Sequence, residues 1–167
     1  MDSLYTLAEQ LGQVMRQQHL LLVTAESCTG GWVGEVVTAV PGSSQWYDRG
    51  FITYSNAAKM AMLGVRQETL DRWGAVSEQT VAEMAAGALL HSDAGIALSI
   101  SGIAGPGGGS PAKPVGTVCF GWAVRSGPVW TQVRHFPGDR QMIRRQAVQA
   151  GLLEVLGYLE QQPSQPA

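Results

Sequence analysis

Apolar positions follow two different spacings along the first part of the chain. Residues 3–18 carry leucines three or four positions apart, which marks one face of an amphipathic helix, and Ser3 is available as its N-cap. Residues 20–25 form a short continuous apolar run, which is typical of a buried strand. The pattern therefore predicts a helix followed by a strand.

The same patterns continue to the end of the chain. Helices are expected where amphipathic or alanine-rich stretches lie between caps and breakers, and strands where β-branched and aromatic residues cluster. Ser55 or Asn56 caps one helix, and Ser126-Gly127 joins the last two strands as a hairpin turn. The further helices cover residues 31–40, 56–63, 78–91 and 139–159, and the further strands cover 51–54, 96–101, 115–124 and 129–136.

Helices alternate with strands in the first half, and a hairpin follows in the second half. Alternation places helices on both faces of a parallel sheet, and the hairpin adds antiparallel strands. We predict an α/β fold, namely a single three-layer α/β/α domain with a mixed sheet including an antiparallel hairpin. This domain covers residues 1–160, and a flexible tail covers residues 161–167.

Composition narrows the classes of function. The chain has 167 residues, 45% hydrophobic and 14% charged, which is enough for one domain with a core. A net charge of -2 with no basic cluster argues against a nucleic-acid partner. No apolar run approaches the roughly 20 residues of a membrane span, and the first ten residues lack a signal-peptide pattern. We expect a cytoplasmic protein with no membrane or nucleic-acid partner.

Chemistry-bearing residues follow the first strand, in the segment "AESCTGG". Ser27 precedes Thr29, Gly30 and Gly31 at a predicted helix start, where unpaired N–H groups could bind an oxyanion or a phosphate. Alternatively, Ser27 or Thr29 simply caps the helix. Cys28 is a rival nucleophile, since a helix N-terminus lowers a thiol pKa. Adjacent residues leaving a strand face opposite ways, so one of the pair Ser27 and Cys28 points into the core.

Lys59 stands out because the chain has two lysines, Lys59 and Lys113, against nine arginines. It falls in the first turn of a predicted helix, where the helix dipole disfavours a cation. That position and partial burial would lower its pKa and supply a neutral amine as a general base. The alternative is a solvated surface lysine. Tyr54, at the end of the preceding strand, could relay a proton or be a half-buried aromatic.

Other candidates carry weaker signals. The loop "GIAGPGGG" offers backbone donors to a flat or phosphorylated ligand, but it is neither GxGxxG nor a P-loop. Arg140 and Arg144 lie one helical turn apart and form either an anion site or a solvated face. His135 with Asp139 could imitate a Ser-His-Asp arrangement, although a solvated strand histidine is favoured. Cysteine and histidine spacing predicts no metal site.

Together these motifs are more specific than each alone. "TAESCTGG", "GSSQWYDRGFITYSNAAK", "GAVSEQT", "SISGIAGPGGGSPAKPVGTV" and "FPGDRQMIRRQA" resemble the CinA C-terminal domain family, in order over residues 4–156. The chain is most similar to the stand-alone members of that family, the PncC-type nicotinamide mononucleotide amidohydrolases. The resemblance implies hydrolysis of nicotinamide mononucleotide to nicotinate mononucleotide and ammonia, in pyridine nucleotide salvage and hence NAD metabolism.

The resemblance also implies roles for individual residues. Ser27 would be the nucleophile and Lys59 its base, with Tyr54 assisting. Helix-end N–H groups would hold the oxyanion, and loop amides with an arginine would hold the phosphate, with no metal or other cofactor. The expected oxyanion and substrate-binding residues are Thr29, Gly30, Gly31, Gly102, Ile103, Ala104, Gly105, Gly107, Gly108, Arg140 and Arg144.

Other functions remain open at this point. A nucleotide-binding module without turnover would use the same loop and arginines but would not explain Lys59. A cysteine hydrolase would use Cys28, and a paralogue could keep the motifs and hydrolyse a different amide. Five tryptophans and an apolar composition lead us to expect a homo-oligomer, in the simplest case a dimer.

Overall fold

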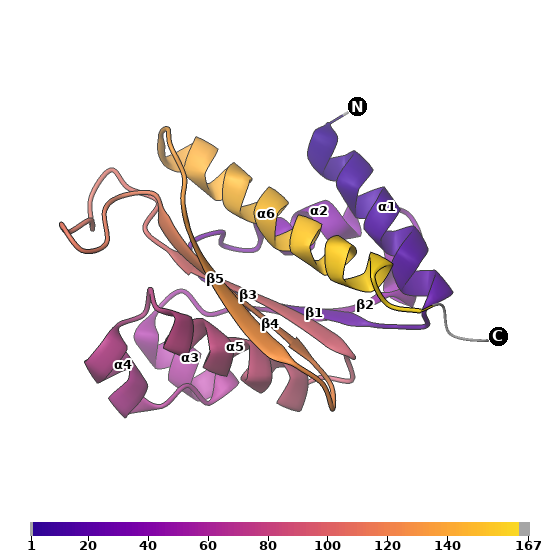
Figure 1. Cartoon of the computed structure of the whole chain (residues 1–167), viewed down its shortest axis with the longest axis horizontal. Helices are drawn as coiled ribbons and strands as arrows, with labels where there is room; N and C mark the ends of the chain where they lie inside the picture. The colour runs from indigo at the N-terminus through magenta and orange to yellow at the C-terminus, as the bar shows by residue number, and fades with distance from the viewer. Residues whose placement is uncertain (1, 164–167) are drawn as a thin grey trace.

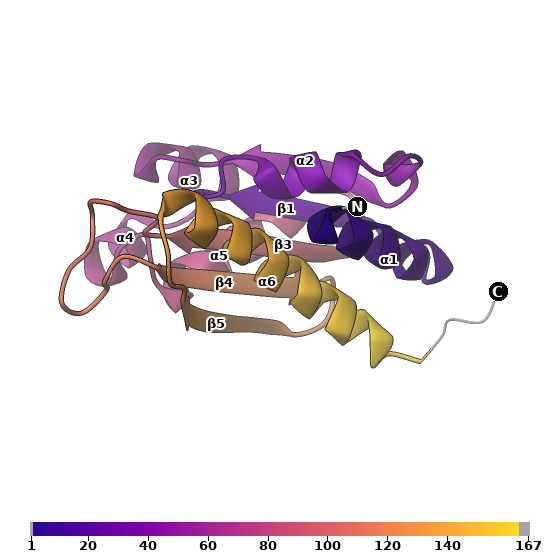
Figure 2. The same ribbon diagram turned by 90° about the horizontal axis from the view of Figure 1, so that it is seen from above.

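A five-stranded sheet lies between two layers of helices in the computed structural model, which describes residues 2–163 (Figure 1). In sheet order the strands are β2 (Tyr47–Ile52), β1 (Leu22–Glu26), β3 (Ile96–Gly102), β4 (Thr117–Val124) and β5 (Val129–His135). β1 runs parallel to β2 and β3, whereas β4 is antiparallel to both β3 and β5. Figure 2 shows β1, β3, β4 and β5 side by side from above. The predicted three-layer α/β fold with a mixed sheet and a hairpin is confirmed.

Helices lie on both faces of the sheet (Figure 1). The α1 face carries α1 (Ser3–Gln17), α2 (Trp32–Thr38) and α6 (Arg140–Glu160). The α5 face carries α3 (Asn56–Leu63), α4 (Gln67–Trp73) and α5 (Glu78–Leu90). A short 3-10 helix, Ser43–Gln45, precedes β2. None of the helices in residues 2–163 is both long enough and apolar enough to cross a membrane.

Side-chain alternation along the strands explains why the two faces differ. On β3, Ile96, Leu98 and Ile100 pack into the α1 face, while the intervening positions are small and face α5. A side chain at Gly121 on β4 would clash with the Val81 carbonyl of α5. Large apolar residues therefore build the α1 side of the core, and small residues let α5 pack close to the sheet.

Some expected boundaries are wrong. Asp2, not Ser3, caps α1, because its carboxylate accepts from the Leu4 amide at 3.0 Å. The expected strand over residues 51–54 instead spans Tyr47–Ile52. Its first residues are polar and show no strand pattern in the sequence, but they pair with β1. The helix α4 was not predicted at all. The last helix, predicted to end at residue 159, ends at Glu160. Of the expected tail over residues 161–167, residues 164–167 lie outside the described residues.

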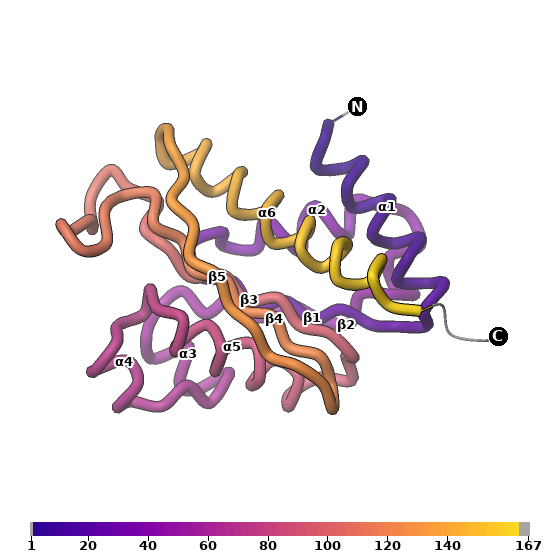
Figure 3. The backbone as a smooth tube through the Cα atoms, viewed as in Figure 1, coloured from indigo at the N-terminus to yellow at the C-terminus, as the bar shows by residue number. Residues whose placement is uncertain are grey.

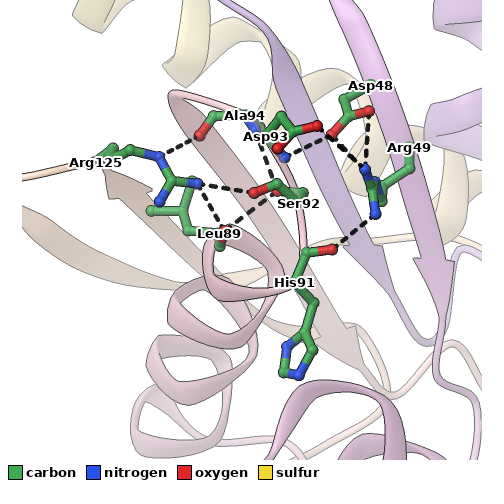
Figure 4. A network of polar contacts seen from close by, with 8 residues as sticks. All are labelled: Asp48, Arg49, Leu89, His91, Ser92, Asp93, Ala94 and Arg125. Atoms are coloured by element: carbon green, nitrogen blue, oxygen red, sulfur yellow. Dashed lines mark hydrogen bonds and ion pairs between the residues drawn. The ribbon is translucent and has the colours of Figure 1, made fainter.

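A polar network fixes the end of the sheet where β2 begins and α5 ends (Figure 4). The Arg125 guanidinium donates to the carbonyls of Leu89 at 2.7 Å and Ala94 at 2.8 Å. Arg49 donates to the His91 carbonyl at 3.0 Å from the start of β2. These hydrogen bonds supply donors to carbonyls at the end of α5, and they hold in place the segment that connects α5 to β3.

The opposite end of the sheet, where β1 and β3 finish, is built from connecting segments. The loop of residues 103–116 between β3 and β4 extends beyond this end, as the tube in Figure 3 shows. In an α/β sheet, the carboxyl ends of parallel strands are where ligands bind. The segments singled out in the sequence, after β1, β2 and β3, therefore all meet at this end.

Candidate active site

Ser27 is held at the end of β1 by both neighbouring strands. Its amide donates to the Ile100 carbonyl of β3 at 2.9 Å. Thr53, the residue that follows β2, donates its amide to the Glu26 carbonyl at 2.8 Å. The Ser27 side chain is 8% exposed and turns toward the α5 face. Its Oγ lies 3.0 Å from Lys59 Nζ. The structure therefore brings together two predicted site residues that are far apart in sequence.

Lys59 is buried in α3 rather than solvated. Ser55 caps this helix by accepting from the Ala58 amide at 3.0 Å, as one of the two predicted caps. The Lys59 side chain is 1% exposed, and its Nζ also donates to the Thr53 carbonyl at 2.9 Å. The ion pairs among the described residues do not include it. Desolvation lowers its pKa, so the surface-lysine alternative is wrong.

Cys28 points away from this pair. It is 7% exposed and packs in the core of the α1 face, as the opposite orientation of adjacent residues predicts. Burial raises the pKa of its thiol to about 12, so the thiolate is scarce near neutral pH. The cysteine-hydrolase alternative therefore lacks both the orientation and the ionisation it needs.

Glu26 is a functional neighbour that the sequence reasoning missed. Its carboxylate is buried on the α1 face, where it accepts from the Thr29 hydroxyl at 2.6 Å. It also accepts from the amides of Gly31, Val33 and Gly34 at 3.2, 3.0 and 3.1 Å, at the beginning of α2. An acidic residue just before a glycine-rich helix start was the available signal, because a carboxylate suits a helix N-terminus.

Glu26 thereby uses donors that were expected to face an oxyanion. The Thr29 hydroxyl and the Gly31 amide both bind Glu26, and Thr29 is fully buried. The Gly30 amide donates to the Ser27 carbonyl at 3.1 Å. The amides of Gly30 and Gly31 are therefore not free for a ligand, whereas the Thr29 amide makes no hydrogen bond with the described residues and stays a predicted oxyanion donor.

The two predicted arginines make different contacts. Arg144 donates through Nε to the Cys28 carbonyl at 3.0 Å and through Nη2 to the Thr29 carbonyl at 3.1 Å. Its guanidinium also lies over the Trp32 ring, 5.4 Å from the ring centroid. Arg144 therefore clamps the segment that carries Ser27 against α6.

Arg140 instead joins the two outer segments of the site. Its Nη1 donates to the Gly105 carbonyl at 2.8 Å, and its Nη2 donates to the Tyr54 hydroxyl at 3.3 Å. Tyr54 is 64% exposed and, among the described residues, its hydroxyl makes no hydrogen bond with Ser27 or Lys59. Arg140 is itself exposed, and no carboxylate of the described chain pairs with it.

The first residues of the glycine-rich loop, residues 102–109, still pair with the start of β4. Ile103 donates to the Thr117 carbonyl at 2.9 Å and accepts from the Gly116 amide at 2.8 Å, so the sheet pairing continues into the loop. Gly102 and Ile103 are half-buried, and Ala104 and Gly105 are buried. Gly107 and Gly108 are exposed, and the positive φ of 88° at Gly108 suits glycine. The outer glycines are therefore the part of the loop that can approach a ligand.

Two other features do not belong to this site. A groove of about 540 Å³ between β5 and α6, lined by His135, Phe136 and Leu153 among others, contains neither Ser27 nor Lys59. Asp139 is the N-cap of α6, where it accepts from the Met142 amide at 2.9 Å. The structure therefore does not bring His135 and Asp139 together with Ser27 as a Ser-His-Asp triad. In the described range 2–163, no three His, Cys, Asp or Glu side chains cluster as metal ligands would.

Comparison with known proteins gives a consistent picture. A model of the CinA C-terminal domain matches residues 4–159. The nicotinamide-nucleotide amidohydrolase PncC of Escherichia coli K12 is 56% identical over 87% of this chain and 88% of its own length. PncC of Pseudomonas putida is 49% identical over 91% and 94%.

Solved structures agree with the fold. The competence/damage inducible protein of Agrobacterium tumefaciens superposes with a TM-score of 0.91 at 44% identity, covering 96% of this chain and 98% of its own. The competence damage-inducible protein A of Klebsiella pneumoniae has a TM-score of 0.93 at 36% identity, covering 97% and 100%. Both matches span nearly the whole three-layer domain.

Proposed function

The chain belongs to the CinA C-terminal domain family, and from this premise we propose that it is a nicotinamide-nucleotide amidohydrolase that uses a Ser27–Lys59 pair. It would convert nicotinamide mononucleotide and water to nicotinate mononucleotide and ammonia. The names of its PncC relatives support the substrate and the reaction. The contacts around Ser27 support the mechanism.

One observation carries the mechanism. Lys59 Nζ lies 3.0 Å from Ser27 Oγ in a buried position, and no acidic side chain within residues 2–163 forms an ion pair with its ammonium. Because desolvation favours the neutral amine, Lys59 can accept a proton from a hydroxyl that would otherwise be a poor nucleophile. A binding module without turnover has no need of a buried, unpaired lysine against a serine.

The chemical steps follow from this pair. Lys59 takes the Ser27 proton as Oγ attacks the carboxamide carbon and the carbonyl oxygen becomes an oxyanion. Collapse of the intermediate breaks the C–N bond, and the Lys59 ammonium gives its proton to the departing nitrogen, which leaves as ammonia. A water molecule then attacks the acyl-enzyme ester while neutral Lys59 accepts its proton. Breakdown returns that proton to Ser27 Oγ and releases the acid.

The phosphate of the substrate is assigned to the outer part of the site. Arg140 is exposed, carries an uncompensated charge and lies between Tyr54 and Gly105. The outer glycines Gly107 and Gly108 add backbone amides at the same end of the sheet. Arg144 is less suited to hold phosphate, because two of its nitrogens already bind the carbonyls of the Ser27 segment.

Other properties follow as part of the same proposal. The reaction steps use protein groups and water, so activity should survive treatment with a metal chelator. We also propose a cytoplasmic location, where pyridine nucleotides are salvaged, and a homodimer, for which exposed apolar residues such as Val133 and Leu153 offer a contact surface.

Ammonia release from nicotinamide mononucleotide by single variants tests the function. Ser27→Ala should lower kcat by at least about 10³-fold, since the nucleophile is lost. Cys28→Ala removes the neighbouring thiol from the core and serves as the matched control, with kcat within a few fold of the wild type.

Two results would overturn the proposal. Activity that persists in Ser27→Ala and disappears in Cys28→Ala would reassign the nucleophile. Tight binding of the nucleotide by wild-type protein with no ammonia released would favour the binding module.

A further inference from the structure

Lys59 has fewer hydrogen-bond acceptors than its charged form needs. In the proposed reaction its amine becomes an ammonium, which has three N–H groups. Among the described residues Nζ has two acceptors, the Ser27 hydroxyl at 3.0 Å and the Thr53 carbonyl at 2.9 Å. Because the Lys59 side chain is 1% exposed, the third N–H is shielded from bulk water. A third acceptor should therefore lie in the protein beside the first two.

Thr53 carries a buried hydroxyl without a partner. The residue is fully buried, and its Oγ1 makes no hydrogen bond with the residues that the structure describes. Both main-chain groups of Thr53, in contrast, are used: its amide donates to the Glu26 carbonyl, and its carbonyl accepts from Lys59. A buried hydroxyl without a partner costs stability, so its presence calls for another role.

The Thr53 side chain lies on the α5 face of the sheet. In the parallel pairing of β1 and β2, Glu26 is opposite Ile52, so the next residues, Ser27 and Thr53, lie side by side about 4.8 Å apart. A side chain at Gly31 would meet Ile52 at 2.9 Å, which places Ile52 on the α1 face at the start of α2. Successive residues alternate between faces, so the Thr53 hydroxyl is on the face that carries the amine.

A hydroxyl suits this position better than a carboxylate. An opposite charge beside Lys59 would raise its pKa and keep the amine protonated. A hydroxyl can stabilise the ammonium by one hydrogen bond and still leave the neutral amine available as a base. The missing acceptor and the unpartnered hydroxyl therefore match in chemistry as well as in place.

Ion pairing does not complete the contacts of the ammonium within residues 2–163. Glu26 binds the first amides of α2 on the other face of the sheet. Burial raises the pKa of the nearby Cys28 thiol to about 12, so the thiol is neutral. Other titratable side chains of β2 and α5 bond elsewhere, namely Tyr47, Asp48, Arg49, Glu78 and Glu83. Neutral oxygen atoms are thus what Lys59 has to stabilise its charge.

We propose that Thr53 is a positioning residue for the base, whose hydroxyl accepts a hydrogen bond from the third N–H of Lys59 when the amine is protonated. This inference rests on the proposed function, because it concerns the proton that Lys59 takes from Ser27. No covalent bond to Thr53 forms or breaks, and its own proton stays on Oγ1. Thr53 acts through Lys59 alone, so KM should be unaffected.

Direct titration of Lys59 tests this contact without any substrate. The chain has two lysines, so carbon-13 NMR of the lysine Cε atoms gives two signals, and Lys113→Arg assigns them. Thr53→Val keeps the shape and the carbonyl of the residue but removes the hydroxyl. Loss of one hydrogen bond to the ammonium should lower the Lys59 midpoint by about one pH unit. Thr53→Ser keeps the hydroxyl and should return the midpoint close to the wild-type value.

Thr24→Val is the matched control. Thr24 is also a fully buried threonine, on β1, but its hydroxyl lies 2.7 Å from the Tyr47 hydroxyl and bonds to it. Its loss should lower the melting temperature and leave the Lys59 midpoint within about 0.3 of the wild-type value.

The pH–rate profile separates positioning from a general loss of structure. At high pH the resting amine is neutral and the charge appears in the transition state, so Thr53→Val should lower kcat about tenfold. At low pH the resting ammonium and the transition state lose the same hydrogen bond, so the two kcat/KM profiles should converge. A structural defect would instead lower the rate by one factor at every pH.

Three results would overturn the inference. They are a Lys59 midpoint in Thr53→Val within about 0.3 of the wild-type value, an equal shift in Thr53→Ser, and a rate loss that does not depend on pH. Failure of the proposed function looks different. If the midpoints shift as expected but wild-type protein releases no ammonia from nicotinamide mononucleotide, the substrate assignment fails and the contact between Thr53 and Lys59 stands.

Discussion

At the scale of single residues, the site depends on one amine kept without a counter-charge. Lys59 contacts Ser27 Oγ and the Thr53 carbonyl, and its burial lowers the pKa of the ammonium. The residue types and their positions at strand and helix ends made Ser27 and Lys59 candidates, and the family resemblance supplied their expected roles. Their 3.0 Å contact was not predictable, since it depends on how β1 and α3 pack.

The lowered pKa of Lys59 predicts how activity depends on pH. The neutral amine is the active form, so kcat/KM should rise with pH and then level off. The midpoint of the rise should lie below the pKa of an ordinary lysine, roughly 10.4. Lys59→Arg, which keeps the charge but cannot lose its proton near neutral pH, should be inactive throughout. A pH–rate profile for both proteins checks this, and a rate that is flat or falls with pH would contradict it.

The same shift links Lys59 to stability. Between the lowered pKa of the folded protein and the ordinary pKa of the unfolded chain, the unfolded state binds more protons, so stability rises with pH across that window. Lys59→Met removes the charge, and its gain in melting temperature over the wild type should therefore be larger at pH 7 than at pH 10. Differential scanning calorimetry at the two pH values measures this gain. An equal difference at both would argue that Lys59 is not perturbed.

At the scale of elements, the first amides of α2 donate to the Glu26 carboxylate. The sequence predicted a helix there and suggested that its first amides were free for a ligand. Glu26 was missed because its role depends on the turn that brings its side chain back over Thr29 and Gly31. Similarly, the start of β2 was missed because its polar residues gain their strand conformation from pairing with β1.

Removing the Glu26 carboxylate should disturb both the fold and the chemistry. Glu26→Ala would leave the Thr29 hydroxyl and three amides of α2 without acceptors, which should lower the free energy of unfolding by about 3 kcal/mol. kcat should also fall at least tenfold, because the loosened turn carries Ser27. Glu35→Ala, on the exposed side of the same helix, is the matched control. Urea denaturation of the two variants measures the difference, and equal stabilities would refute this role.

At the scale of the whole molecule, the two ends of the sheet are specialised. The network around Arg125 and Arg49 fixes one end, while the segments after β1, β2 and β3 form the site at the other. The fold class and the element types other than α4 could be predicted from periodicity, because most elements bury an apolar face of their own. The strand order could not, since it is set by long-range pairing that no local pattern encodes.

The most direct test of the account is to trap the acyl-enzyme. Wild-type protein mixed with nicotinamide mononucleotide is quenched in acid within the first turnover, digested and analysed by mass spectrometry. We predict that the peptide containing Ser27 and Cys28 gains the mass of nicotinate mononucleotide minus water, attached to Ser27 Oγ, and that Ser27→Ala gives no adduct. An adduct on Cys28, or none during a measured burst of ammonia, would contradict the Ser27–Lys59 mechanism.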